Sequence, residues 1–124
     1  MSGQQVLIID DEEPVRLAVA DILGDCGLAV MTAEDGETGL ALYREHSTEI
    51  DLVLLDLSMP GLSGEETFQQ LRAINPQARV VLSSGYHPAE VARRFSNQRH
   101  HGFIQKPYDA VKLIDAIQRY LAGD

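Results

Sequence analysis

The chain has 124 residues and a mass of 13.6 kDa, which is the usual size of one domain and makes a two-domain enzyme or a long repeat array improbable. Its 44% hydrophobic and 23% charged residues are an ordinary globular composition, not that of a disordered chain. Ten Lys and Arg residues against nineteen Asp and Glu residues give a formal net charge of −9, which repels nucleic-acid backbones and anionic membranes. We therefore expect one domain over 1–124, with a core at about 6–121, that binds neither nucleic acid nor membrane directly.

The cysteine content and the absence of an apolar span favour a cytoplasmic protein. Cys26 is the only cysteine, so no disulfide forms within the chain, and we expect it in the core. No apolar run approaches the roughly 20 residues that span a bilayer, and the N-terminus lacks the order of a secretory signal. Residues 1–3 are native or a cloning remnant, and we assign them no part in the fold.

Five short apolar runs recur at regular intervals and predict five strands, at 6–9, 29–32, 52–55, 80–82 and 103–104. The first, third and fourth runs are continuous and do not alternate with polar residues. Such runs are typical of parallel strands that are covered on both faces.

The clearest predicted helix lies between the first two strands. Apolar residues repeat there at helical spacing, at Val15, Ala18, Val19, Ile22, Leu23 and Cys26. Glu12, Glu13 and Pro14 suit the start of a helix, and Gly27 suits the left-handed conformation that ends one.

A second clear helix follows Asp109, with one apolar stripe formed by Ala110, Leu113, Ile114, Ile117 and Leu121. Weaker patterns predict helices at 36–45, at 64–73 with Ser63 as N-cap, and at 88–96. In the last of these only Val91 and Phe95 mark an apolar side, so we expect it to be the least firmly packed.

Strands that alternate with helices of this length predict βαβ units. Such units form a mostly parallel, doubly wound α/β sheet with helices on both faces. In these sheets the ligand site lies beyond the carboxyl ends of the strands.

Polar residues gather at those strand ends: Asp10 and Asp11 after the first strand, Asp56 at the third, Ser83 and Ser84 at the fourth, and Lys106 after the fifth. Taken singly, each is readily explained as a helix cap, a turn residue or a solvated lysine. Their joint placement points to a site, because close carboxylates repel one another unless a cation holds them. A few oxygen ligands beside space for phosphate oxygens are typical of Mg²⁺.

Four stretches closely resemble the receiver domain of two-component response regulators: VLIIDDEEP at 6–14, LVLLDLSMPGLSG at 52–64, VVLSSGY at 80–86 and FIQKP at 103–107. The resemblance covers about 6–121. It implies a flavodoxin-like sheet of five parallel strands in the order 2-1-3-4-5.

By this resemblance Asp56 is the phosphoacceptor, which takes a phosphoryl group from the phosphohistidine of a histidine kinase or histidine phosphotransfer domain. Asp11, Asp56 and the backbone carbonyl of Ser58 are expected to ligate Mg²⁺, with Asp10 acting through a metal-bound water. Lys106 is expected to pair with Asp56 before transfer and with the phosphoryl group afterwards.

The resemblance also implies a switch. The Ser84 hydroxyl moves to the phosphoryl group, and Phe103 turns into the vacated space. The face of the fourth helix, fifth strand and fifth helix then changes. The alternative for Phe103 is a static side chain in the core. Ser58 and Tyr86 occupy positions that tune the phosphoryl lifetime. The bond before Pro107 is expected to be cis.

The partner on the changing face is not identified by the sequence. A basic segment on the expected signalling side either meets an acidic partner or is solvated. It consists of Arg93, Arg94, Arg99, His100 and His101. We expect a monomer or a phosphorylation-dependent dimer, either free-standing or cut from a longer protein. The LSSGY stretch at 82–86 and the short ending resemble receivers at the C-termini of hybrid histidine kinases.

Three other functions fit parts of the sequence. A Mg²⁺-dependent phosphohydrolase also uses an Asp nucleophile, but it needs a second carboxylate where Ser58 stands. A flavin-binding module shares the fold, yet the acidic residues 10–13 make a poor cradle for an FMN phosphate. A scaffold that never carries a phosphoryl group does not need the full set of strand-end residues.

Overall fold

The computed structural model describes residues 4–59, 63–95 and 102–122, in which five strands alternate with five helices. The strands are β1 (Gln5–Ile9), β2 (Ala29–Ala33), β3 (Leu52–Asp56), β4 (Val80–Ser84) and β5 (Gly102–Gln105). The helices are α1 (Glu13–Asp25), α2 (Gly36–His46), α3 (Gly64–Ile74), α4 (Pro88–Arg94) and α5 (Ala110–Leu121). Each predicted element is present, with its ends shifted by at most two residues.

The strands form one parallel sheet in the order β2-β1-β3-β4-β5, as the resemblance implied. The three inner strands are the continuous apolar runs, and nearly all of their residues are buried. The two edge strands are more exposed. Coverage of both faces was therefore predicted correctly for β1, β3 and β4.

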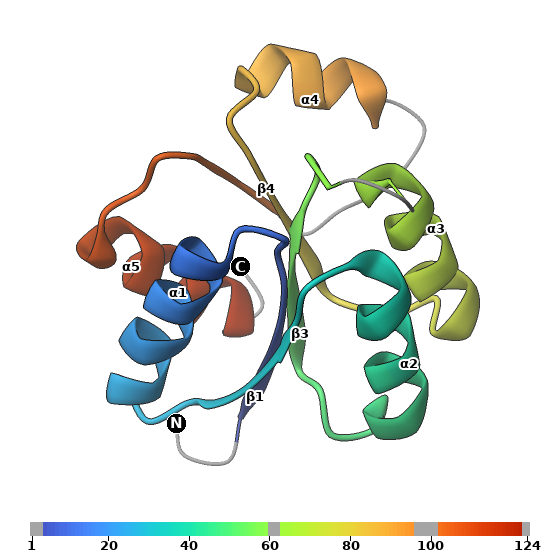
Figure 1. The fold of residues 1–124 in the computed structure, drawn as a ribbon, viewed down its shortest axis with the longest axis horizontal. Helices are drawn as coiled ribbons and strands as arrows, with labels where there is room; N and C mark the ends of the chain where they lie inside the picture. Colours follow the sequence, from blue (N-terminus) through green and yellow to red (C-terminus); the bar gives the residue numbers. More distant parts are fainter. Residues whose placement is uncertain (1–3, 60–62, 96–101, 123–124) are drawn as a thin grey trace.

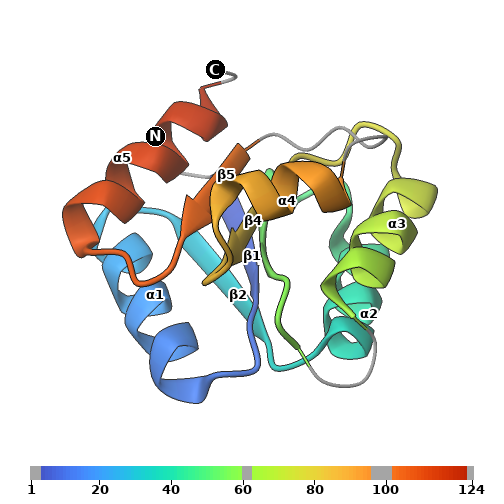
Figure 2. The same cartoon turned by 90° about the horizontal axis from the view of Figure 1, so that it is seen from above.

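Helices cover both faces of the sheet, with α1 and α5 on one side and α2 and α3 on the other (Figure 1). The alternation along β1 explains the two layers, because Val6 and Ile8 pack with α1 and α5 while Leu7 and Ile9 pack with α2 and α3. Seen from above, β5 lies between α5 and α4 (Figure 2). No helix of the described segments is long and apolar enough to cross a membrane.

Helix α1 departs in part from its predicted apolar stripe. Val19 and Leu23 are buried as expected, but Ala18 is exposed and Cys26 is only half-buried. The prediction was wrong for Ala18 because this residue lies on the margin of the stripe, turned away from the sheet. Gly27 ends the segment with a φ of 87°, the left-handed conformation that its position predicted.

The N-terminus of α3 carries the predicted cap. Ser63 Oγ accepts a hydrogen bond from Glu66 N at 3.1 Å, and Glu66 Oε1 accepts one from Ser63 N at 3.2 Å. This reciprocal pair is a capping box. It fixes where α3 begins.

Helix α4 is the shortest helix among the described residues, and it ends at Arg94, not at 96 as predicted. Phe95 is its C-cap, and residues 96–101 lie outside the described segments. Val91 and Phe95 are both buried against the core that α2 and α3 cover. The Phe95 ring meets Phe68 of α3 edge to face, at 5.3 Å between centroids.

Candidate functional site

The carboxyl ends of β1 and β3 bring three carboxylates together. Asp10, Asp11 and Asp56 each place a carboxylate oxygen so that all three oxygens lie within 4.8 Å of one another. Asp10 is 3% exposed and Asp56 is 1% exposed. Because burial removes solvent screening, this cluster is costly unless positive charge offsets it.

Asp56 is only partly satisfied by its neighbours. Its Oδ1 accepts a hydrogen bond from Ser58 N at 3.0 Å. Its Oδ2 and the Oδ1 of Asp11 are buried and accept no hydrogen bond from the described residues. Burial, the charge of Asp10 and the hydrogen-bonding contact of Asp11 together raise the pKa of Asp56 to about 6, against the opposing effects of the Ser58 N–H and Lys106. These unmet acceptors give the site capacity for a cation.

Lys106 reaches this cluster from the loop after β5. Its Nζ lies 3.0 Å from Asp10 Oδ2, 3.0 Å from Glu12 Oε1 and 3.5 Å from Asp56 Oδ2. Burial opposes the charge of Lys106, but hydrogen bonds to Asp10 and Glu12 and the charge of Asp56 together raise its pKa above the ordinary value. The Lys106 ammonium thus pairs with Asp56, as the resemblance implied, but it lies nearer to Asp10 and Glu12.

Asp10 is held by the chain that follows it. Its Oδ1 accepts a hydrogen bond from Glu12 N at 2.9 Å, and Arg16 Nη1 donates to its backbone carbonyl at 2.9 Å. The N-cap of α1 is Glu12, so neither Asp10 nor Asp11 is that cap. Sequence reasoning missed the contacts of Glu12 and Arg16 with the site; their signal was their position two and six residues after Asp10.

The end of β4 forms the next part of the site. Ser84 is fully buried, and its Oγ accepts a hydrogen bond from Tyr86 N at 2.9 Å. Lys106 N donates to Ser84 O at 2.8 Å, which ties the loop after β5 to β4. The peptide bond between Lys106 and Pro107 is cis, as predicted. Phe103 is half-buried against the core on the α2 and α3 side.

The basic segment is only partly described. Arg99, His100 and His101 lie outside the described residues. Arg93 forms an exposed ion pair with Glu90, and Arg94 pairs with Glu90 and with Glu65. The two arginines therefore have acidic neighbours within the chain.

Comparison with known proteins identifies the family. A family model described as the response regulator receiver domain matches residues 6–118. The chain is a response regulator receiver domain. It is 31% identical to the chemotaxis protein CheY of Bacillus subtilis, over 96% of this chain and 98% of that protein. The receiver domain of NtrX from Brucella abortus has a solved structure that superposes with a TM-score of 0.86 at 32% identity, covering 96% of this chain and 99% of that one.

Receiver domains also occur inside longer proteins. The sensor kinase CckA of Brucella abortus is 29% identical over 94% of this chain, which spans only 12% of that kinase. As a receiver domain, the chain belongs to two-component phosphorelay signal transduction, where receivers act with histidine kinases or phosphotransfer proteins. It is a signalling domain.

Proposed function

We propose that this receiver accepts a phosphoryl group on Asp56 from the phosphohistidine of a histidine kinase or histidine phosphotransfer domain. The observation that carries the proposal is the Asp56 carboxylate. It ends the central strand β3, is nearly fully buried, has one oxygen without a hydrogen bond, and lies 3.5 Å from the Lys106 ammonium. A buried nucleophile beside a fixed cation is suited to phosphoryl transfer, which depends mainly on positioning and electrostatics.

The proposed step is a nucleophilic displacement at phosphorus. A carboxylate oxygen of Asp56 forms a bond to phosphorus, the bond between phosphorus and the imidazole nitrogen breaks, and the imidazole leaves with that electron pair. Lys106 then holds a phosphoryl oxygen, and the Ser84 hydroxyl donates to another. The chain catalyses only its own phosphorylation and dephosphorylation, with lifetimes tuned at Ser58 and Tyr86.

The acidic cluster fits Mg²⁺. Asp11, Asp56 and the backbone carbonyl of Ser58 would hold the ion, and Asp10 would act through a bound water; the fit rests on the two buried acceptors, Asp11 Oδ1 and Asp56 Oδ2. When bound, Mg²⁺ supplies positive charge beside the transferring phosphoryl oxygens. The carboxylates would set its place relative to Asp56.

Intact mass after incubation with Mg²⁺ and a small phosphodonor such as acetyl phosphate tests this function. We expect one added phosphoryl group, which is absent when a chelator replaces Mg²⁺. Donor hydrolysis without any mass gain would favour a phosphohydrolase. A protein that stays unmodified and inert even with candidate kinases would instead be a scaffold, and the proposal would be wrong.

Removal of one proposed ligand is expected to weaken Mg²⁺ binding. Asp11→Asn removes the charge of a carboxylate whose Oδ1 is buried and unpaired, so we expect a loss of affinity of at least about tenfold by isothermal titration calorimetry. Glu13→Gln removes an exposed charge on the adjacent turn and serves as the matched control, with a change below about twofold. Equal losses in both variants would mean that the effect is only net charge.

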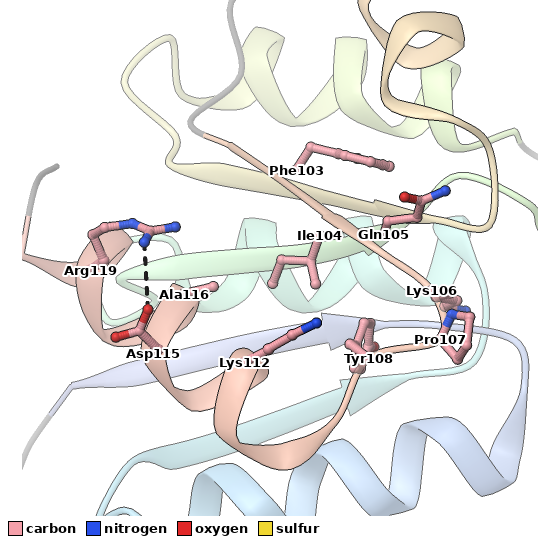
Figure 3. A pocket seen from close by; sticks show the side chains of 10 residues that line it. All are labelled: Phe103, Ile104, Gln105, Lys106, Pro107, Tyr108, Lys112, Asp115, Ala116 and Arg119. Carbon is pink, nitrogen blue, oxygen red and sulfur yellow. Dashed lines mark ion pairs between the residues drawn. The ribbon is translucent and has the colours of Figure 1, made fainter.

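We further propose that phosphorylation changes the face of α4, β5 and α5, through Ser84 and Phe103. A cavity of about 540 Å³ lies along β5 and α5 on this side, lined in part by Tyr108, Lys112 and Arg119 (Figure 3). Figure 3 shows Phe103 on the opposite side of β5 from Ile104 and α5. A turn of the Phe103 ring would therefore change the α4 side of the strand directly.

We place this receiver in the cytoplasm as a single domain with its core at about 6–121, in keeping with its lone cysteine. It acts as a monomer or as a phosphorylation-dependent dimer. An origin in a hybrid histidine kinase is supported by the similarity to the receiver domain of the hybrid histidine kinase CckA.

A further inference from the structure

Arg94 contacts two segments that border the phosphoacceptor, the start of α3 and the turn after β4. Its Nη1 lies 3.1 Å from Glu65 Oε1, in the first turn of α3, and its Nε lies 3.2 Å from Glu90 Oε2, one turn earlier in α4. Its guanidinium carbon lies 4.3 Å from the centre of the Tyr86 ring, in the turn between β4 and α4. One side chain thus connects α3, α4 and the turn after β4.

Both connected segments adjoin the site. Helix α3 starts against β3: a Cβ placed on Gly64 would lie 2.9 Å from Asp56 O, so Glu65 follows a residue packed on the phosphoacceptor itself. At the other end, Tyr86 N donates to Ser84 Oγ at 2.9 Å. The contacts therefore run without a break from Ser84 through Tyr86 and Arg94 to the start of α3.

The Ser84 hydroxyl takes part in two interactions that require different positions, one with Tyr86 N–H and the proposed one with the phosphoryl group. In this structure it is the acceptor for Tyr86 N–H, whereas phosphoryl binding requires it to move toward Asp56. If Ser84 Oγ moves, Tyr86 N–H loses its acceptor and the turn 84–86 must rearrange. The Arg94 guanidinium lies over the Tyr86 ring and pairs with Glu65 and Glu90, so a rearrangement of the turn has to break or shift these contacts.

We propose that Arg94 is a positioning residue that restrains the turn 84–86 in its unphosphorylated arrangement, and so slows phosphoryl uptake at Asp56. This inference rests on the proposed function. The restraint consists of exposed ion pairs and a cation–π contact, each individually weak, so its loss corresponds to a change of roughly three- to tenfold. Only the form with a released turn accepts the phosphoryl group, so its population sets the rate.

Arg93 is the matched control. It is the preceding residue of α4, is 74% exposed and also pairs with Glu90. In the described segments it has no contact with Glu65 or the Tyr86 ring. Arg93→Ala and Arg94→Ala thus remove the same charge from the same helix, but only the second frees Tyr86.

The experiment measures two quantities in wild type, Arg93→Ala, Arg94→Ala, Arg94→Lys and Glu65→Gln. The first is the rate of phosphoryl uptake from acetyl phosphate with Mg²⁺, followed by intact mass. The second is hydrogen exchange of the Tyr86 amide in the unphosphorylated, metal-free protein. We expect Arg94→Ala to take up phosphoryl roughly three to ten times faster and to exchange the Tyr86 amide faster, with Arg93→Ala unchanged.

Glu65→Gln and Arg94→Lys test whether Arg94 positions the turn 84–86 or only stabilises α4. Glu65→Gln is expected to change both quantities in the same direction as Arg94→Ala, less strongly, and Arg94→Lys to restore part of the restraint, because lysine keeps the charge but not the planar fork. Loss of α4 stability alone would not accelerate uptake. The proposal fails if Arg94→Ala behaves like Arg93→Ala, or if Tyr86 exchange increases while uptake is unchanged or slower. If no variant takes up phosphoryl, the proposed function fails, and Tyr86 exchange still decides the restraint.

Discussion

Asp56→Asn is expected to abolish phosphoryl uptake and, in metal-free protein at pH 7.5, to raise the unfolding temperature. The first effect follows from loss of the nucleophile. The second follows from the raised pKa of Asp56, about 6 against an ordinary 3.8, which reports the cost of burying its charge. Removing that charge is worth on the order of 2 kcal/mol, or several degrees of unfolding temperature.

The stabilisation depends on pH with a definite sign. Below about pH 4 the Asp56 carboxyl is neutral in both the folded and the unfolded chain, so its charge costs nothing. Between pH 4 and 6 the unfolded chain ionises first, and stability falls as pH rises; above pH 6 the cost is fully present. The gain from Asp56→Asn should therefore be large at pH 7.5 and small near pH 4. Lys106 Nζ also lies 3.0 Å from Asp10 Oδ2 and from Glu12 Oε1 in the wild-type protein, so we expect its charge to stay paired in the variant.

Thermal unfolding in a chelating buffer at the two pH values, together with intact mass, tests this prediction. Asp21→Asn, an exposed position on α1, is the control and should change neither quantity. Addition of Mg²⁺ should stabilise wild type more than Asp56→Asn, because the variant lacks a proposed ligand. A variant that is destabilised at pH 7.5, or whose gain is the same at both pH values, would contradict the burial cost assigned to Asp56.

The sequence was informative wherever a periodic or local signal sets the structure. Continuous apolar runs identified the inner strands, and the resemblance gave the strand order. Ser63 identified the start of α3, because its capping box lies within four residues of chain. The strand ends then placed Asp10, Asp11 and Asp56 at one edge, because parallel strands share that edge.

What the sequence did not predict depends on contacts between distant side chains. The pairing of Lys106 with Glu12 joins residues 94 positions apart, and the pair of Arg94 with Glu65 joins residues 29 positions apart. Glu12, Glu65 and Arg94 give no local signal of a partner, because an exposed arginine or glutamate is usually solvated. Ala18 shows the same limit within a helix, where the exact rotation of the buried stripe is set by the sheet below it.

Gly64→Ala is expected to destabilise the protein by about 1–3 kcal/mol, because a side chain has no room at this position. A Cβ on Gly64 would lie 2.5 Å from Leu57 Cα and 2.9 Å from Asp56 O, both backbone atoms of the segment that carries the phosphoacceptor. A flexible side chain can move aside, but these backbone atoms shift only if α3 or the end of β3 shifts. The variant should therefore also bind Mg²⁺ more weakly than wild type.

Gly24→Ala in α1 provides the opposite case. No atom lies within 4 Å of a Cβ built at Gly24, and its surface is exposed, so alanine should add about 0.5–1 kcal/mol through its better helix propensity. Chemical denaturation of both variants, with Mg²⁺ titration of each, separates packing from propensity. Equal stability changes would mean that α3 can shift away from β3 at no cost. A large loss in Gly64→Ala alone, accompanied by weaker Mg²⁺ binding, would show that the close approach of α3 to β3 holds the Asp56 carboxylate in place.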